Sequence, residues 1–318
     1  MAAIKVRWTP HPRLSAIHAA YVIASGGESV DPPCQRLLLG PVTELNDRLL
    51  SASVDVRLFW RRLIQETAAD RSLPERPGGD RIDERACEIA LTAAGVSEFQ
   101  LEATAQAVAR RIGECRSAFY SRFPKLADQL RLRSGPLKER WETYGPGLLH
   151  AVARRIWDGD PPPDWWPPRF EALLLQPIRG GAGDFDAEGQ RFWLEAMLTD
   201  AEPTVPEVLR VAWLMTRIAI ETHTREKSGE RSVSLPWSFG SVPILLAAAG
   251  DLELVADAMG SIPTAMRLWQ LGDDAVAATV VHWWRRQSAD PRPLPIALQS
   301  LREMLRNASQ PADRVHHG

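Results

Sequence analysis

The chain contains little cysteine, tyrosine and lysine, and these shortages exclude several classes of protein. Its three cysteines, Cys34, Cys87 and Cys115, lie far apart and form no Cys-x-x-Cys pair. This excludes a disulfide framework and a zinc knuckle, and it is typical of reduced, buried thiols in a cytoplasmic protein. Strand signals are also sparse, because the chain has three tyrosines and no Asn-Gly or Asp-Gly turn between alternating segments.

Long apolar runs are missing as well. The stretch from Leu14 to Ala24 is interrupted by Ser15 and His18, so it is too short for a signal peptide or a membrane span. We expect no membrane partner and a cytoplasmic location. The net charge of −2, with 25% charged residues, excludes a protein whose whole surface attracts nucleic acid or membranes.

Apolar residues recur at the spacing of helices through most of the chain. Pro41 suits the first turn of a helix, and an apolar stripe follows it from Leu45 to Ile64. Between Thr204 and about Glu226, apolar residues surround most of the helix circumference, which predicts a central, buried helix. We therefore predict an all-α protein built as a multi-helix bundle.

Two glycine–aspartate pairs predict the arrangement of the C-terminal helices. In Gly250-Asp251 and Gly272-Asp273, the glycine suits a helix stop and the aspartate suits the N-cap of the next helix. Short helices joined by such turns are typical of αα-hairpin arrays. We predict a solenoid-like C-terminal part.

Five prolines and two tryptophans occur within residues 158–168. Such a segment cannot be a helix interior. It predicts an N-terminal helical region (1–157), a Pro/Trp-rich connector (158–168), a C-terminal helical region (169–307) and a tail (308–318), with one continuous domain as the alternative. Exposed tryptophans on a free linker would be costly, so we expect Trp165 and Trp166 to pin the connector to the protein.

Residues 184–195 match the ligand spacing of a calcium-binding loop. The oxygen ligands would be Asp184, Asp186, Glu188 and Glu195. The surrounding sequence does not fit, because Arg191 occupies a position that should be aliphatic. We favour the interpretation that Asp184 or Asp186 caps a helix beginning near Ala187. Apart from this calcium alternative, no cofactor is predicted.

A glycine-rich stretch, Arg179-Gly-Gly-Ala-Gly183, comes just before this window. Backbone N–H groups of such a stretch can hold a phosphate at the start of a helix. The Gly-Lys-Ser/Thr ending of a P-loop is absent, and the acidic residues that follow would repel an anion. We interpret the stretch as a flexible loop.

Tryptophan and arginine recur as neighbours in a chain with twelve tryptophans. The candidate binding surface comprises Trp60, Arg61, Arg62, Arg154, Arg155, Trp157, Trp165, Trp166, Trp283, Trp284, Arg285 and Arg286. Such clusters suit single-stranded nucleic acid, and they also suit protein–protein hot spots. For any single pair we favour the plainer interpretation that tryptophan enters the core while its neighbouring arginine meets water.

Charge is distributed in blocks. Residues 101–157 carry eleven Lys and Arg against five Asp and Glu, whereas residues 158–207 carry three against eleven. Our default is that these blocks neutralise each other. The alternative is a basic face that binds an acidic partner or nucleic acid.

No catalytic motif is readable, since the histidines lack the spacing of metal-dependent hydrolases. We predict a non-enzymatic helical protein-interaction module or a subunit of a larger intracellular assembly, with a protein as its partner. A nucleic-acid-binding accessory protein is the first alternative. The second is an enzyme whose site is assembled from scattered residues such as His150, Glu221 and His223.

Overall fold

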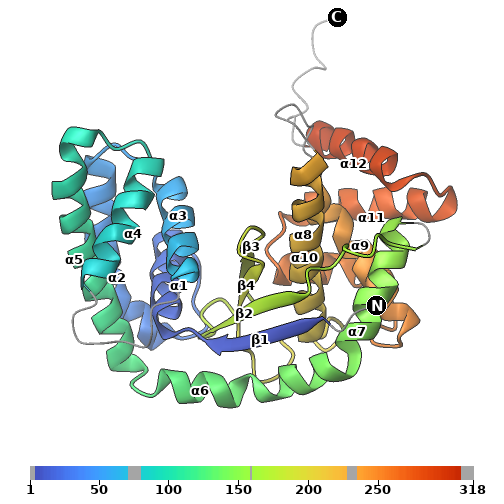
Figure 1. The fold of residues 1–318 in the computed structure, drawn as a ribbon, viewed down its shortest axis with the longest axis horizontal. Helices are drawn as coiled ribbons and strands as arrows, with labels where there is room; N and C mark the ends of the chain where they lie inside the picture. Colours follow the sequence, from blue (N-terminus) through green and yellow to red (C-terminus); the bar gives the residue numbers. More distant parts are fainter. Residues whose placement is uncertain (1–3, 71–79, 158–159, 228–234, 309–318) are drawn as a thin grey trace, which may run out of the picture.

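The computed structural model describes residues 4–70, 80–157, 160–227 and 235–308, and most of them are helical, as predicted. Figure 1 shows two groups of helices with a small sheet between them. The first group comprises α1 (Pro12–Ala24), α2 (Pro32–Ser51), α3 (Val56–Ala69), α4 (Asp80–Ala93) and α5 (Glu98–Arg122). The second comprises α7 (Gly135–Trp157), α8 (Glu207–Lys227), α9 (Trp237–Asp251), α10 (Ile262–Leu268), α11 (Asp274–Ala289) and α12 (Leu294–Ala308).

Aspartate side chains begin several of these helices. Asp31, Asp55 and Asp273 each accept a hydrogen bond of 2.9 Å from the backbone N–H three residues further on. They thereby satisfy one of the free donors of the first turn. The predicted single helix from Pro41 to Ile64 is wrong, because α2 ends at Ser51 and a new helix starts after Asp55.

The sheet has four strands in the order β1-β2-β4-β3. Strands β1 (Lys5–Pro10), β2 (Arg169–Leu175) and β4 (Arg191–Glu195) are parallel, and β3 (Gly183–Asp186) pairs antiparallel with β4. The prediction of an all-α protein is therefore wrong. Strands β2 and β4 are almost entirely buried, and a short, fully buried strand has no polar alternation to distinguish it from a piece of buried helix.

Helix α6 (Leu126–Arg133) joins the two helical groups and contacts β1. In Figure 1 it runs beside β1, which is the edge strand of the sheet. A helix along this edge protects it from pairing with another chain.

Residues 160–168 of the predicted connector are packed into the protein, and residues 158 and 159 lie outside the described ranges. Trp165 and Trp166 are buried, as the pinned connector predicted. The Trp165 ring lies edge-on to Trp157 at the end of α7 and stacks on His223 of α8, with centroid distances of 5.3 and 4.9 Å. The connector leads directly into β2, which pairs with β1, so segments on both sides of it share one sheet.

Of the two predicted glycine–aspartate turns, the second is present in the structure and the first is not. Gly272 has a φ of +95° and Asp273 caps α11, as predicted. Gly250 instead lies inside α9, and α10 begins only at Ile262. Helices α11 and α12 pack against each other as one αα-hairpin, but a solenoid-like stack is not confirmed.

We expect Gly145→Ala in α7 to lower the free energy of unfolding by about 1–3 kcal/mol, the usual range for overpacking. An added Cβ would lie 2.6 Å from the buried ring of Trp141. Gly113→Ala in α5 is the matched control, because its Cβ would meet nothing within 4 Å. This control substitution should raise the free energy of unfolding by about 0.5–1 kcal/mol, because alanine favours a helix more than glycine does. Urea unfolding measures both, and an equal effect in both variants would contradict the packing around Trp141.

Candidate functional site

A buried carboxylate lies where the parallel strands end. Glu195 closes β4, and its side chain has no exposed surface. Its Oε1 accepts backbone N–H bonds from residues 178 and 179 at 2.9 and 2.8 Å. Its Oε2 accepts them from residues 180, 181 and 182 at 2.8, 2.8 and 3.4 Å. The loop 178–182 therefore forms an anion cradle, which this carboxylate fills.

Glycine makes this cradle possible. Gly180 and Gly181 have φ values of +83° and +136°, a backbone region that other residues rarely adopt. Their N–H groups can therefore turn inward to meet Oε2 of Glu195.

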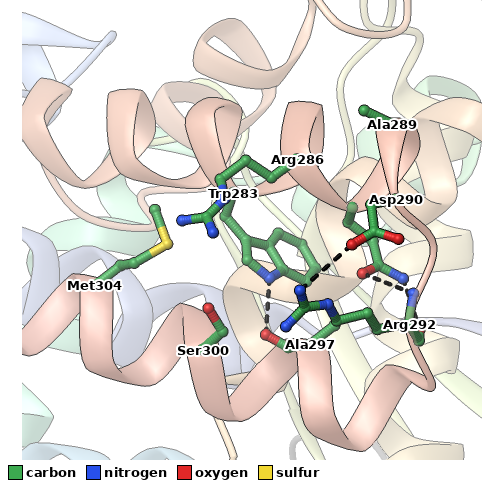
Figure 2. A pocket seen from close by; sticks show the side chains of 9 residues that line it. Trp283, Arg286, Ala289, Asp290, Arg292, Ala297, Ser300 and Met304 are labelled. Atoms are coloured by element: carbon green, nitrogen blue, oxygen red, sulfur yellow. Dashed lines mark hydrogen bonds and ion pairs between the residues drawn. The ribbon is translucent and has the colours of Figure 1, made fainter.

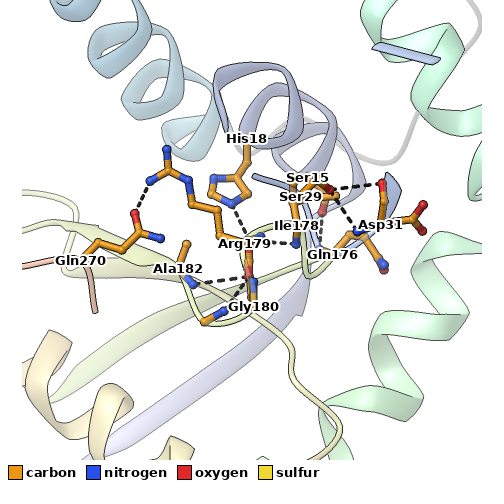
Figure 3. A network of polar contacts seen from close by, with 12 residues as sticks. Ser15, His18, Ser29, Asp31, Gln176, Ile178, Arg179, Gly180, Ala182 and Gln270 are labelled. Atoms are coloured by element: carbon orange, nitrogen blue, oxygen red, sulfur yellow. Dashed lines mark hydrogen bonds and ion pairs between the residues drawn. The ribbon is translucent and has the colours of Figure 1, made fainter. Parts of the chain in front are cut away.

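Helix α1 supplies a sixth bond to the carboxylate. His18 Nε2 lies 2.9 Å from Oε1 of Glu195, and both side chains are buried. One turn earlier, the Ser15 hydroxyl accepts a 3.1 Å bond from the backbone N–H of Gln176. These contacts, seen in Figure 3, attach α1 of the first helical group to the loop that follows β2.

Helix α8 attaches to the same point from the other helical group. Arg210 is buried and donates to the backbone carbonyls of Glu195, at 2.9 Å, and Ala182. Its charge is paired with Glu207 one turn earlier. Glu195 is thus held through its side chain by α1 and through its backbone by α8.

Burial alone would raise the pKa of Glu195. The hydrogen bond and charge of His18, together with the N–H groups of Arg179 and Gly181, outweigh this effect and lower the pKa from 4.5 to about 2. Glu195 is therefore a fixed anion at neutral pH.

Phosphate binding by the glycine-rich loop and calcium binding by Glu195 were the interpretations that the sequence did not favour, and in the structure this loop and this side chain contact each other. The loop 178–182 does bind an anion through its backbone, but that anion is Glu195. The predicted N-cap near Ala187 is wrong, because Asp184 and Asp186 lie in β3 and a turn leads directly into β4. Across the described residues, no three His, Cys, Asp or Glu side chains form a group that could hold a metal ion.

A second site, a cavity of about 230 Å³, lies between α11 and α12, and Figure 2 shows the side chains that line it. It is lined by Trp283, Arg286, Gln287, Ala289, Asp290, Arg292, Ala297, Ser300 and Met304. The buried Trp283 indole forms the floor and donates to the Ala297 carbonyl at 2.8 Å. Arg292 pairs with Asp290 at 3.3 Å, whereas Arg286 has no ion-pair partner within the described part of the chain.

The structure separates the predicted Arg/Trp residues onto α3, α7, the connector and α11. The tryptophans Trp60, Trp165, Trp166 and Trp283 are buried, and Trp157 and Trp284 are partly buried. The arginines Arg61, Arg62, Arg154, Arg155, Arg285 and Arg286 are exposed. Tryptophan inside and arginine outside is the pattern that we favoured for single pairs. Only Trp283 and Arg286 line the cavity.

The residues considered for catalysis have other roles or positions. His223 stacks on Trp165, and its Nε2 lies 3.2 Å from the carbonyl oxygens of Asp164 and Trp165. Its ring therefore packs the connector against α8. His150 is exposed on α7. Sequence reasoning missed His18 and Arg210, which carry no motif and lie far along the chain from the loop that they hold.

The three cysteines are buried and form no disulfide, as predicted. Burial raises the pKa of Cys34 and of Cys115 to about 12. They are therefore neutral thiols, which are poor nucleophiles.

Within the described ranges, no helix combines the length and apolar character needed to cross a membrane. Comparisons with protein-family models, curated proteins and solved structures give no match to this chain.

We expect Glu195→Gln to lower the free energy of unfolding by about 3–5 kcal/mol. The substitution removes the buried charge, and the NH2 group of the new amide faces backbone N–H groups of the loop, which then lack an acceptor. Glu188→Gln, at the exposed turn of the hairpin, is the control and should change stability by less than about 0.5 kcal/mol. Urea unfolding at pH 7 compares the two. Equal losses would show that the cradle does not depend on the carboxylate.

The same carboxylate should make stability fall in acid. The folded pKa of about 2 lies below the ordinary 4.5, so the contribution is complete above pH 4.5 and is lost as pH falls toward 2. The shift corresponds to about 3 kcal/mol. Urea unfolding between pH 7 and pH 2.5 should show wild type approaching Glu195→Gln as pH falls. A constant difference would contradict the lowered pKa.

Proposed function

We propose that this protein is a non-enzymatic protein-interaction module and that the groove between α11 and α12 binds a segment of its partner. The observation that carries this proposal is that the exposed guanidinium of Arg286 lies beside the indole of Trp283 in one cavity. Arg286 and Trp283 line one cavity, and Arg286 has no ion-pair partner in the portion of the chain described.

The lining favours a protein segment with an acidic and an apolar side chain side by side. The partly buried Met304 offers apolar surface beside the nearly covered Trp283 and Ala297, and Arg286 offers one cation. Asp290 already neutralises Arg292. At about 230 Å³ the groove falls below the size usual for small-molecule sites, so it suits one or two side chains. Arginine and tryptophan also dominate protein–protein hot spots.

The alternatives have weaker support. Base stacking on the predicted clusters needs exposed rings, and four of the six tryptophans are buried. An enzyme needs free reactive groups, and His18, Glu195 and Arg210 at the carboxyl ends of the parallel strands are engaged in holding helices and strands together. We also propose a cytoplasmic location, and the unpaired, buried cysteines support it. An αα-hairpin surface formed by α11 and α12 also suits a subunit of a larger assembly.

Charge reversal in the groove tests this proposal. A partner is first identified by co-purification from the native host, and its affinity is then measured with purified proteins. Arg286→Glu should weaken binding at least tenfold, whereas Arg285→Glu, the same change on the neighbouring exposed residue, should leave it within about twofold. Ser300→Trp, which fills the groove without changing charge, should weaken binding as well. A chain without partners, or equal effects of the two charge reversals, would overturn the proposal.

A further inference from the structure

Three cations share one exposed face of the sheet at the amino ends of β1 and β2. Side chains alternate between the two faces along each strand. The register pairs Lys5 with Arg169 and Arg7 with Glu171, so these four side chains share a face. Lys5, Arg7 and Arg169 are exposed, whereas Phe170, on the opposite face, is buried.

This arrangement places like charges next to each other. Adjacent strands lie about 4.8 Å apart, and Arg7 follows Lys5 by about 6.6 Å along the same strand. Like charges directly opposite each other destabilise a sheet. Lys5, Arg7 and Arg169 form no ion pair with any residue that the structure describes. Glu171, opposite Arg7 in the register, brings one carboxylate to this face, and Arg191 on the next strand pairs with Asp186 at 3.7 Å, so one carboxylate stands against three cations.

We propose that Lys5, Arg7 and Arg169 form a phosphate-binding site. A phosphate brings several oxygens and more than one charge, so it can meet two neighbouring cations at once, whereas a carboxylate matches one. The paired backbones of β1 and β2 fix the spacing at which the three side chains leave the sheet. The phosphate comes either from a free phosphate compound or from the backbone of a nucleic acid. The site is separate from the groove between α11 and α12.

Binding of two probes at low salt tests the site. Inorganic pyrophosphate is titrated by calorimetry, and a 20-nucleotide single strand is followed by fluorescence anisotropy. The double variant Lys5→Ala/Arg169→Ala should lose at least tenfold in affinity. The control Arg36→Ala/Arg48→Ala removes two exposed arginines of α2 and should stay within about twofold. For the oligonucleotide, the magnitude of the slope of log K against log salt should fall by about 1.4 in the double variant, because each phosphate contact to a single strand contributes about 0.7.

The two probes separate the two sources of phosphate. Pyrophosphate binding without a preference for the oligonucleotide assigns the site to free phosphate compounds, and oligonucleotide binding alone assigns it to a backbone. Absence of binding by both probes, unchanged affinity in the double variant, or equally tight binding of a poly-glutamate peptide would overturn the proposal. Without ligand at low salt, the double variant should melt at or above the temperature of wild type, because a like-charge contact is gone. This shows that a loss of binding is not a loss of folding.

Discussion

The burial of one carboxylate determines how the two helical groups are joined. An ionised Glu195 inside the protein would be strongly destabilising without partners. Five consecutive N–H groups and His18 satisfy its side chain, and Arg210 binds its backbone carbonyl. Because the donors to the carboxylate come from α1 and from the loop after β2, the charge can be buried only when these two are assembled, and Arg210 of α8 binds the backbone of the same residue. The sheet is thus the junction of the molecule.

How much of the fold and of the site could be predicted depends on how close together in the sequence the interacting residues lie. Asp273 caps α11 as the sequence indicated, since an N-cap and its helix are neighbours in the chain. The strands were missed because β4 and residues 172–175 of β2 are buried on both faces and carry no alternation. At the site, phosphate binding by the glycine loop and calcium binding by Glu195 were each considered as alternatives and not favoured. Their pairing was not considered, because it depends on the β3–β4 hairpin. His18 lies 177 residues from Glu195, and no local pattern connects them.

The difference between local patterns and contacts of distant residues also applies to the surface. Neighbouring arginine and tryptophan in the sequence point in different directions on a helix, so most clusters split into a core residue and a solvated one. Between α11 and α12 the two types meet again, with the indole of Trp283 under the groove and Arg286 at its side. On the sheet, cations that are unremarkable in sequence become neighbours through strand register. Binding chemistry in this protein therefore arises where elements come together.

Native-state hydrogen exchange of the backbone amides of residues 178–182 tests the role of Glu195 most directly. An irregular loop normally exchanges through local opening at low free energy. If the buried carboxylate holds the loop and joins the helical groups, these five amides should exchange only on opening that approaches global unfolding, as slowly as the amides of α8. Exchange at the rate of an ordinary surface loop would contradict the account.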